Sequence, residues 1–209
     1  MPEPSTLAER MAQARQRVAS ARQQPPTGAP AKPAYSHWIL DGRPGENLVL
    51  MPGQMHFGAQ VASLRTLLGS CVAVTLWHPQ RRIGGMCHYL LPSRPRAGLE
   101  RDGRYGEEAV EAMVEQLQRM GTAPSDYHAH LYGGADTMPE GSTLKFSVGE
   151  RNIEQGWTLI DRYGFQLQGV DVGEDVPRTV TLQLGSGEVD MRRGVGKAPP
   201  QHPLQRQTR

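Results

Sequence analysis

Residues 71 to 92, CVAVTLWHPQRRIGGMCHYLLP, restrict the possible folds of this chain more than any other stretch. Two runs rich in β-branched and aromatic residues flank a segment that contains proline, a pattern that predicts two antiparallel strands joined by a turn. Successive side chains of a strand point to opposite faces. Val72 and Cys87 therefore fall on an apolar face, which we expect to be the core. Cys71 and His88 fall on the other face, which is smaller and partly polar.

The rest of the chain supplies elements for a mixed α/β domain. Apolar residues at helical spacing predict one helix over residues 105–121, which ends at a glycine, and a second over residues 150–164. Alternating or β-branched runs predict further strands in ENLVLMPGQMHF, YHAHLYGG, FQLQGVDV and RTVTLQLGSGEVDMRR. We therefore expect a layered α/β fold in which two main helices pack against a largely antiparallel sheet system.

The two ends of the chain differ in composition from its middle. Residues 1–36 contain a short amphipathic pattern followed by QQPPTGAPAKPAY, which is typical of an extended, proline-rich linker. Residues 193–209 are basic, rich in proline and without acidic residues, which predicts a disordered tail. We expect a flexible N-terminal arm over 1–36, a folded domain over 37–192 and a disordered tail over 193–209.

Charge and hydropathy exclude several classes of protein. The formal net charge is +2, and much of the excess lies in the basic tail, so the composition does not predict nucleic-acid binding. The sequence has no apolar run of roughly 18 residues and no signal-peptide pattern, so we expect a cytoplasmic protein without membrane insertion. Two cysteines in a reducing compartment are not expected to form a structural disulfide.

The hairpin brings a cysteine and a histidine together. With the turn placed symmetrically about the Pro79–Gln80 bond, Cys71 is predicted to lie directly opposite His88. Directly opposed residues have Cβ atoms roughly 4.5 to 5.5 Å apart, which is close enough for a thiol and an imidazole to meet. An imidazole takes the thiol proton or stabilises the thiolate as an ion pair, and the ion pair lowers the pKa of the cysteine. The arrangement favours Cys71 as a nucleophile and His88 as its base.

The residues just before Cys71 complete this candidate site. Thr66 is the local candidate for a third polar group that orients the histidine ring. Gly69 and Ser70 allow a tight turn in which backbone N–H groups point at a developing oxyanion. These residue types at this spacing favour acyl transfer by a cysteine nucleophile.

Other interpretations of the same residues remain open. Taken alone, Cys71 is more typical of a small buried hydrophobic residue, and a histidine within a strand is more often structural; the cross-strand pairing favours the catalytic interpretation. Cys87, on the core face, is expected to be inert. The histidines and cysteines lack the spacing of a zinc site, and Gly133 with Gly134 lacks that of a phosphate loop, so we expect no metal and no cofactor. His128 and His130 are expected to be packed or solvated rather than catalytic.

Seven blocks of the sequence resemble the chemoreceptor glutamine deamidase family CheD. They are TLLGSCVAVTLW, GGMCHYLLP, YGEEAVEAMVEQLQRMG, LYGGADTM, VGERNIE, GVDVGEDVPR and GSGEVDMRR. They lie in order between about Leu48 and Arg193. The resemblance implies a layered α/β fold and a Cys-His-Thr site formed by Cys71, His88 and Thr66. One block departs from the family pattern, because Glu174 stands where a glycine is common.

The resemblance also implies an activity and partners. The site is expected to hydrolyse the side-chain amides of glutamines on methyl-accepting chemotaxis receptors, through a thioester on the cysteine. A CheC-type phosphatase is a further expected partner. Two alternatives stay open at this point. One is a receptor methylesterase or a related Cys-His hydrolase that uses the same residues, and the other is a non-catalytic binding module or adaptor that regulates a chemotaxis phosphatase.

Overall fold

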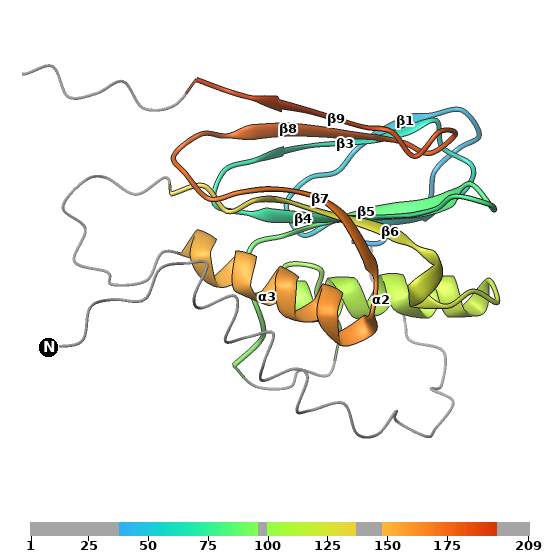
Figure 1. The fold of residues 1–209 in the computed structure, drawn as a ribbon, viewed down its shortest axis with the longest axis horizontal. Coiled ribbons are helices and arrows are strands. Elements are labelled where there is room, and N and C mark those ends of the chain that lie inside the picture. Colours follow the sequence, from blue (N-terminus) through green and yellow to red (C-terminus); the bar gives the residue numbers. More distant parts are fainter. Residues whose placement is uncertain (1–37, 96–99, 137–147, 196–209) are drawn as a thin grey trace, which may run out of the picture.

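The domain has three layers, formed by two β-sheets and a pair of helices (Figure 1). The computed structural model describes residues 38–95, 100–136 and 148–195. The strands are β1 (Asn47–Val49), β2 (Met55–Gly58), β3 (Ser63–Leu68), β4 (Val72–His78), β5 (Ile83–Tyr89), β6 (His128–Gly133), β7 (Gln166–Val172), β8 (Arg178–Gln183) and β9 (Val189–Arg193). The helices are α2 (Gly106–Arg119) and α3 (Val148–Tyr163), and a short 3₁₀ turn, η1 (Pro124–Asp126), precedes β6.

The middle layer is a five-stranded sheet with the order β2-β5-β4-β6-β7. Its first four strands run antiparallel to their neighbours, and β7 is added parallel to β6. Its central strand β4 is buried on both faces, as expected for the run from Val72 to Leu76, in which only Thr75 is polar. The sheet is therefore covered on both sides.

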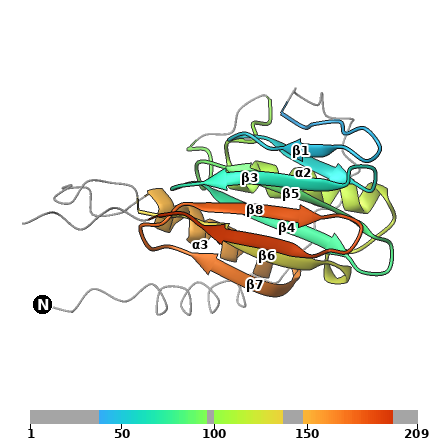
Figure 2. The same cartoon turned by 90° about the horizontal axis from the view of Figure 1, so that it is seen from above.

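The helices cover one face of this sheet, and a second sheet covers the other (Figures 1 and 2). The second sheet has the order β1-β3-β8-β9, and its outer face is open to solvent. Two apolar clusters result. One fills the space between the helices and the five-stranded sheet and includes Val72, Cys87 and Tyr89. The other fills the space between the two sheets and includes Ala73 and Met86.

The hairpin forms as predicted, but its register differs from the expected one by two residues. Ala73, not Cys71, lies opposite His88, because the turn is centred one residue later and four residues connect the paired positions His78 and Ile83. Within this turn, Arg82 adopts a positive φ of 51° and donates its backbone N–H to His78. A shift of two residues keeps every side chain on its predicted face. Cys71 therefore stays on the same side of the sheet as His88.

The predicted fold class is confirmed, with two differences of detail. The small, partly polar face of the hairpin is also a core face, because the second sheet covers it. Strand β3 was not expected, and residues 46–57 form two strands that belong to different sheets. The predicted N-terminal helix and linker lie outside the described residues, as does the predicted basic tail after residue 195. Arg193, the first residue of that predicted tail, is instead the last residue of β9. Among the helices that the structure describes, none is long and apolar enough to cross a bilayer.

Candidate active site

A hydrogen bond between Thr66 and His88 joins the two sheets. Thr66 points inward from β3 and His88 from β5, and both side chains are buried. Thr66 Oγ1 lies 2.7 Å from His88 Nδ1 and 2.8 Å from the carbonyl oxygen of Leu50. The backbone of His88 is also fixed, since its N–H donates to Gln54 and its carbonyl accepts from Gly53. The imidazole is held by the protein at both its ring and its main chain.

The two contacts of Thr66 decide which ring nitrogen of His88 carries a proton. A carbonyl oxygen can only accept, so the single hydroxyl hydrogen of Thr66 is donated to Leu50. His88 Nδ1 is then the donor to Thr66 Oγ1, which leaves Nε2 without a hydrogen in the neutral ring. Nε2 is buried and has no hydrogen-bond partner among the described residues. The ring is therefore set up to accept a proton at Nε2.

Burial keeps this imidazole neutral. It lowers the pKa of His88 to about 4, and the contact with the Leu50 carbonyl opposes this shift only in part. Burial also raises the pKa of the Cys71 thiol above its ordinary value, so the lowering expected from an adjacent imidazole is not found. The free protein thus holds a thiol and a neutral imidazole, not an ion pair. His88 can act as a base only by taking the proton as Cys71 attacks.

Cys71 lies immediately before β4, and its side chain is half-buried against the cluster between the two sheets. Ala73, two residues after Cys71, is the strand partner of His88. The thiol and the imidazole are therefore diagonal neighbours on one face of the sheet. Diagonal neighbours have Cβ atoms somewhat less than about 7 to 8 Å apart. Among the described residues no hydrogen bond joins them, and catalytic contacts of this kind often tighten only when substrate binds.

The loop that carries Cys71 is fixed through three successive carbonyl groups. The oxygen of Gly69 accepts from the backbone N–H of Ala135, and that of Cys71 accepts from the N–H of Gly134. The oxygen of Ser70 accepts from the side-chain amide of Asn152, at 3.2 Å. Within the part of the chain that the structure describes, the N–H groups of Ser70 and Cys71 donate to no backbone carbonyl.

Close backbone packing holds the partners of this loop in place. Gly134 adopts a positive φ of 69°, a conformation that side chains disfavour, which explains the glycine pair that ends β6. At Gly149, near the start of α3, an added Cβ would lie 2.5 Å from the carbonyl oxygen of Gly134. Helix α3 therefore approaches the 133–135 turn more closely than a side chain at position 149 would permit.

Asn152 is a site residue that the sequence analysis missed. It is fully buried on α3, and its Nδ2 donates to the carbonyl oxygens of Ser70 and Leu90. One signal was present in the sequence, since Asn152 is polar yet falls on the apolar stripe of the helix, between Gly149 and Gly156. Its partners lie 82 and 62 residues away, and nothing in the sequence pattern indicates these contacts.

The other candidate residues lie apart from this site. Cys87 faces the helices, is fully buried, and has its pKa raised to about 12 by burial. On β6, His128 packs beside Trp77, with ring centres 6.2 Å apart, and His130 Nδ1 lies 3.2 Å from Thr75 Oγ1. Among the described residues, no cluster of three or more histidine, cysteine or acidic side chains is placed to hold a metal ion.

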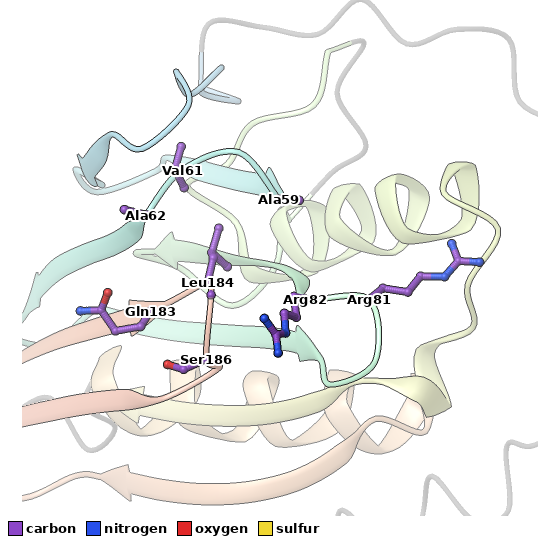
Figure 3. A pocket seen from close by; sticks show the side chains of 9 residues that line it. Ala59, Val61, Ala62, Arg81, Arg82, Gln183, Leu184 and Ser186 are labelled. Carbon is purple, nitrogen blue, oxygen red and sulfur yellow. The ribbon is translucent and has the colours of Figure 1, made fainter.

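A surface hollow lies at the opposite end of β4 from Cys71 (Figure 3). It is formed by the turns between β2 and β3, β4 and β5, and β8 and β9, and its charged lining residues are Arg81 and Arg82. The residues that line it include neither a cysteine nor a histidine. The hollow therefore has no part in the chemistry of Cys71 and His88.

The fold and this constellation of groups describe a class of protein, a layered α/β protein with a thiol and a buried neutral imidazole on one face of its middle sheet. Comparison with known proteins identifies the family. The family described as CheD chemotactic sensory transduction matches residues 90–193. The "Probable chemoreceptor glutamine deamidase CheD 1" of Chromobacterium violaceum is 40% identical over 174 residues, 82% of this chain and 85% of that protein. The "Probable chemoreceptor glutamine deamidase CheD" of Pseudomonas syringae pv. tomato is 42% identical over 68% of this chain and 86% of its own length.

The chain belongs to the CheD family. Among solved structures, YlmD from Geobacillus stearothermophilus is 17% identical over 58% of this chain and 50% of that chain, with a TM-score of 0.34. The family match begins at Leu90, so Thr66, Cys71 and His88 lie before it. The roles of these three residues therefore depend on their geometry and on the sequence blocks around them.

Proposed function

We propose that this CheD protein hydrolyses the side-chain amide of glutamine residues in chemoreceptors, with Cys71 as nucleophile, His88 as base and Thr66 as the residue that orients the base. Membership of a family whose relatives are named chemoreceptor glutamine deamidases supports the reaction. The observation that carries the assignment of residues is the Thr66–His88 hydrogen bond, which leaves Nε2 free of a proton on the face of the sheet that also carries Cys71.

The first half of the reaction forms a thioester. His88 Nε2 takes the thiol proton as Cys71 Sγ attacks the side-chain carbonyl carbon of the glutamine. The carbonyl oxygen becomes an oxyanion, and the N–H groups of Ser70 and Cys71 stabilise it. Gly69 supports the turn that presents them. When this intermediate collapses, the carbon–nitrogen bond breaks and the proton held by His88 leaves with ammonia.

The second half of the reaction releases the product. His88, neutral again, takes a proton from a water molecule, and the resulting hydroxide attacks the thioester carbonyl. The carbon–sulfur bond breaks, Cys71 regains its proton from His88, and the side chain leaves as glutamate. The carboxylic acid that forms gives its proton to ammonia, so the sum is glutamine plus water giving glutamate plus ammonium. No step in this sum needs a metal or a redox group.

Replacement of the nucleophile tests this function. Purified protein is incubated with the cytoplasmic part of a chemoreceptor, and receptor peptides are weighed by mass spectrometry. Wild type should convert glutamine to glutamate, whereas Cys71→Ala and His88→Ala should not. The double variant should be little worse than either single variant, because the two residues act in the same step. A folded Cys71→Ala protein that deamidates at the wild-type rate would make the cysteine a packing residue only.

The same experiment separates the alternative functions. A methylesterase would act on methylated glutamates and leave glutamine unchanged, and a peptidase would cut the receptor backbone, which deamidation leaves whole. A non-catalytic adaptor would leave the receptor mass unchanged with or without Cys71. Cytoplasmic location and binding of a CheC-type phosphatase remain proposals, which cell fractionation and co-purification would test.

A further inference from the structure

We propose that Asn152 is a positioning residue for the oxyanion site, acting through the peptide group between Ser70 and Cys71. The proposal rests on the proposed function, since it concerns the same thioester-forming step. Asn152 touches neither the thiol nor the imidazole. Its side chain instead contacts two backbone carbonyl groups near them. One is the carbonyl of Ser70, which immediately precedes Cys71, and the other is the carbonyl of Leu90, two residues after His88.

The orientation of the Asn152 amide follows from its two partners. The carbonyl oxygens of Leu90 and Ser70, at 2.7 and 3.2 Å, can only accept hydrogen bonds, so both hydrogens of Nδ2 are used. With the amide turned over, its oxygen would face two carbonyl oxygens and repel them. In the observed orientation Oδ1 is buried without a partner among the described residues. A buried amide oxygen without a partner is unfavourable, so a residue selected for stability alone would not be expected to leave one.

The contact with Ser70 determines where the Cys71 N–H points. In a trans peptide group the C=O and the following N–H point in opposite directions. Asn152 holds the Ser70 oxygen toward α3, so the N–H of Cys71 points away from α3. The Gly69 carbonyl, bound to the N–H of Ala135, fixes the Ser70 N–H in the same way. The bonds of the two preceding carbonyls thereby restrain both N–H groups, which is the preorganisation that stabilisation of an oxyanion requires.

Of the three bonds that hold this loop, the one from Asn152 is made by a side chain, so it can be removed by substitution. Asn152→Leu keeps a similar volume on an apolar helix stripe, and Asn152→Ala removes the amide altogether. Each change frees the Ser70–Cys71 peptide to rotate while leaving Cys71, His88 and Thr66 in the sequence. Thr158→Ala is the matched control, since it removes another side-chain bond on α3, from Thr158 to the carbonyl of Glu154.

Two reactions of the same thiol separate positioning from a general structural role. Amide hydrolysis passes through an oxyanion, whereas alkylation of the thiol by iodoacetamide is a direct displacement that forms none. We expect kcat for deamidation of the receptor to fall about 100-fold in both Asn152 variants. KM, and the alkylation rate of Cys71, should change less than about threefold. Thr158→Ala should match wild type in all three quantities.

The outcomes distinguish this inference from the proposed function. Two results would rule out Asn152 as a positioning residue when wild type deamidates the receptor. Folded Asn152→Leu would have the wild-type kcat, or it would lose Cys71 alkylation and deamidation in equal measure. If wild type does not deamidate the receptor, both proposals fail. A further measurement on wild type needs no variant. A peptide with an aldehyde in place of the glutamine amide should add to Cys71 and shift the NMR signal of the Cys71 amide proton downfield, and an unchanged signal would overturn the inference.

Discussion

Thr66 Oγ1 lies 2.7 Å from His88 Nδ1. Through this bond a residue of the second sheet determines which ring nitrogen of a histidine in the five-stranded sheet carries the proton. The hydroxyl hydrogen is committed to Leu50, so the imidazole must donate through Nδ1 and is left basic at Nε2. The nucleophile is not involved in this contact. Changes at Thr66 should therefore act on proton transfer, and not on the thiol itself.

Substitution of Thr66 tests this separation. Thr66→Val keeps the shape of the side chain but removes the hydroxyl, so the ring loses its fixed tautomer. We expect deamidation to slow about 10- to 100-fold, less than the loss that follows removal of a general base. The carbonyl of Leu50 and Nδ1 of His88 lose a partner, which should lower the free energy of unfolding by about 1 to 3 kcal/mol. Thr66→Ser retains the hydroxyl and should keep most of the activity. Equal activity of the valine and serine variants, measured by ammonia release, would contradict the role of the hydroxyl.

The buried imidazole should make stability depend on pH. The pKa of His88 is about 4 in the folded protein, against about 6.5 in an unfolded chain. Between these values the unfolded chain binds the proton and the folded one does not, so lowering the pH favours unfolding. The contribution is fully present above pH 6.5 and should fall by about 3 kcal/mol as the pH approaches 4. The measurement is urea unfolding of wild type and His88→Gln at several pH values, because other groups titrate equally in both. A constant difference between the two proteins would show that His88 is not buried in its neutral form.

The two cysteines should differ in both rate and pH dependence of labelling. Burial raises the pKa of Cys71, so its thiolate fraction, and with it the rate of alkylation, should rise about tenfold per pH unit from pH 6 to 8. His88 is neutral over this range, so His88→Ala should leave the slope unchanged. Cys87 is fully buried and should react only when the protein unfolds. Labelled peptides can be quantified by mass spectrometry, with Cys87→Ser as the control. A flat pH dependence for Cys71 would instead indicate a preformed ion pair with His88.

The buried side chain of Arg178 should contribute strongly to the stability of the domain. Arg178 begins β8 and is fully buried, with bonds to Asp171 on β7 and to the carbonyls of Gly173 and Val176. Arg178→Leu leaves Asp171 without one of its charged partners, which should cost about 3 to 5 kcal/mol of unfolding free energy. Arg192→Leu removes an exposed arginine paired with Asp190 and should cost less than about 1 kcal/mol. Thermal and urea unfolding of both variants provide the comparison. Similar losses in the two would mean that burial of Arg178 contributes little.

Much of the secondary structure was predictable because it depends on local patterns. The stripe of apolar residues and the final glycine placed α2 within two residues of its observed ends, and alternation placed β6 and β7 equally well. Strand β3 was missed, because its residues SLRTLL have no clear alternation and run directly into the glycine-serine turn. The strand is defined by its pairing with β1 and with β8, and β8 lies far away in the sequence.

The same contrast applies to the candidate site. The sequence alone was sufficient to place Cys71 and His88 on one face of a hairpin, since strand alternation survives a register shift of two residues. The shift itself depended on the conformation of the Pro79–Arg82 turn, which the pattern of residue types does not encode. The predicted lowering of the Cys71 pKa failed for a related reason. Burial raised that pKa, and burial of this face is produced by the second sheet.

The sequence by itself determined the helices, most strands, the face that carries the thiol and imidazole, and the family resemblance, because these depend on residues close together along the chain. The tertiary structure decided that a second sheet covers that face, that Thr66 bonds His88, and that Asn152 reaches across 82 residues to the carbonyl of Ser70. Such contacts join elements that meet only when the layers pack. Their geometry is set by the burial of apolar surface on both sides of the central sheet, a property of the whole domain and of no single segment.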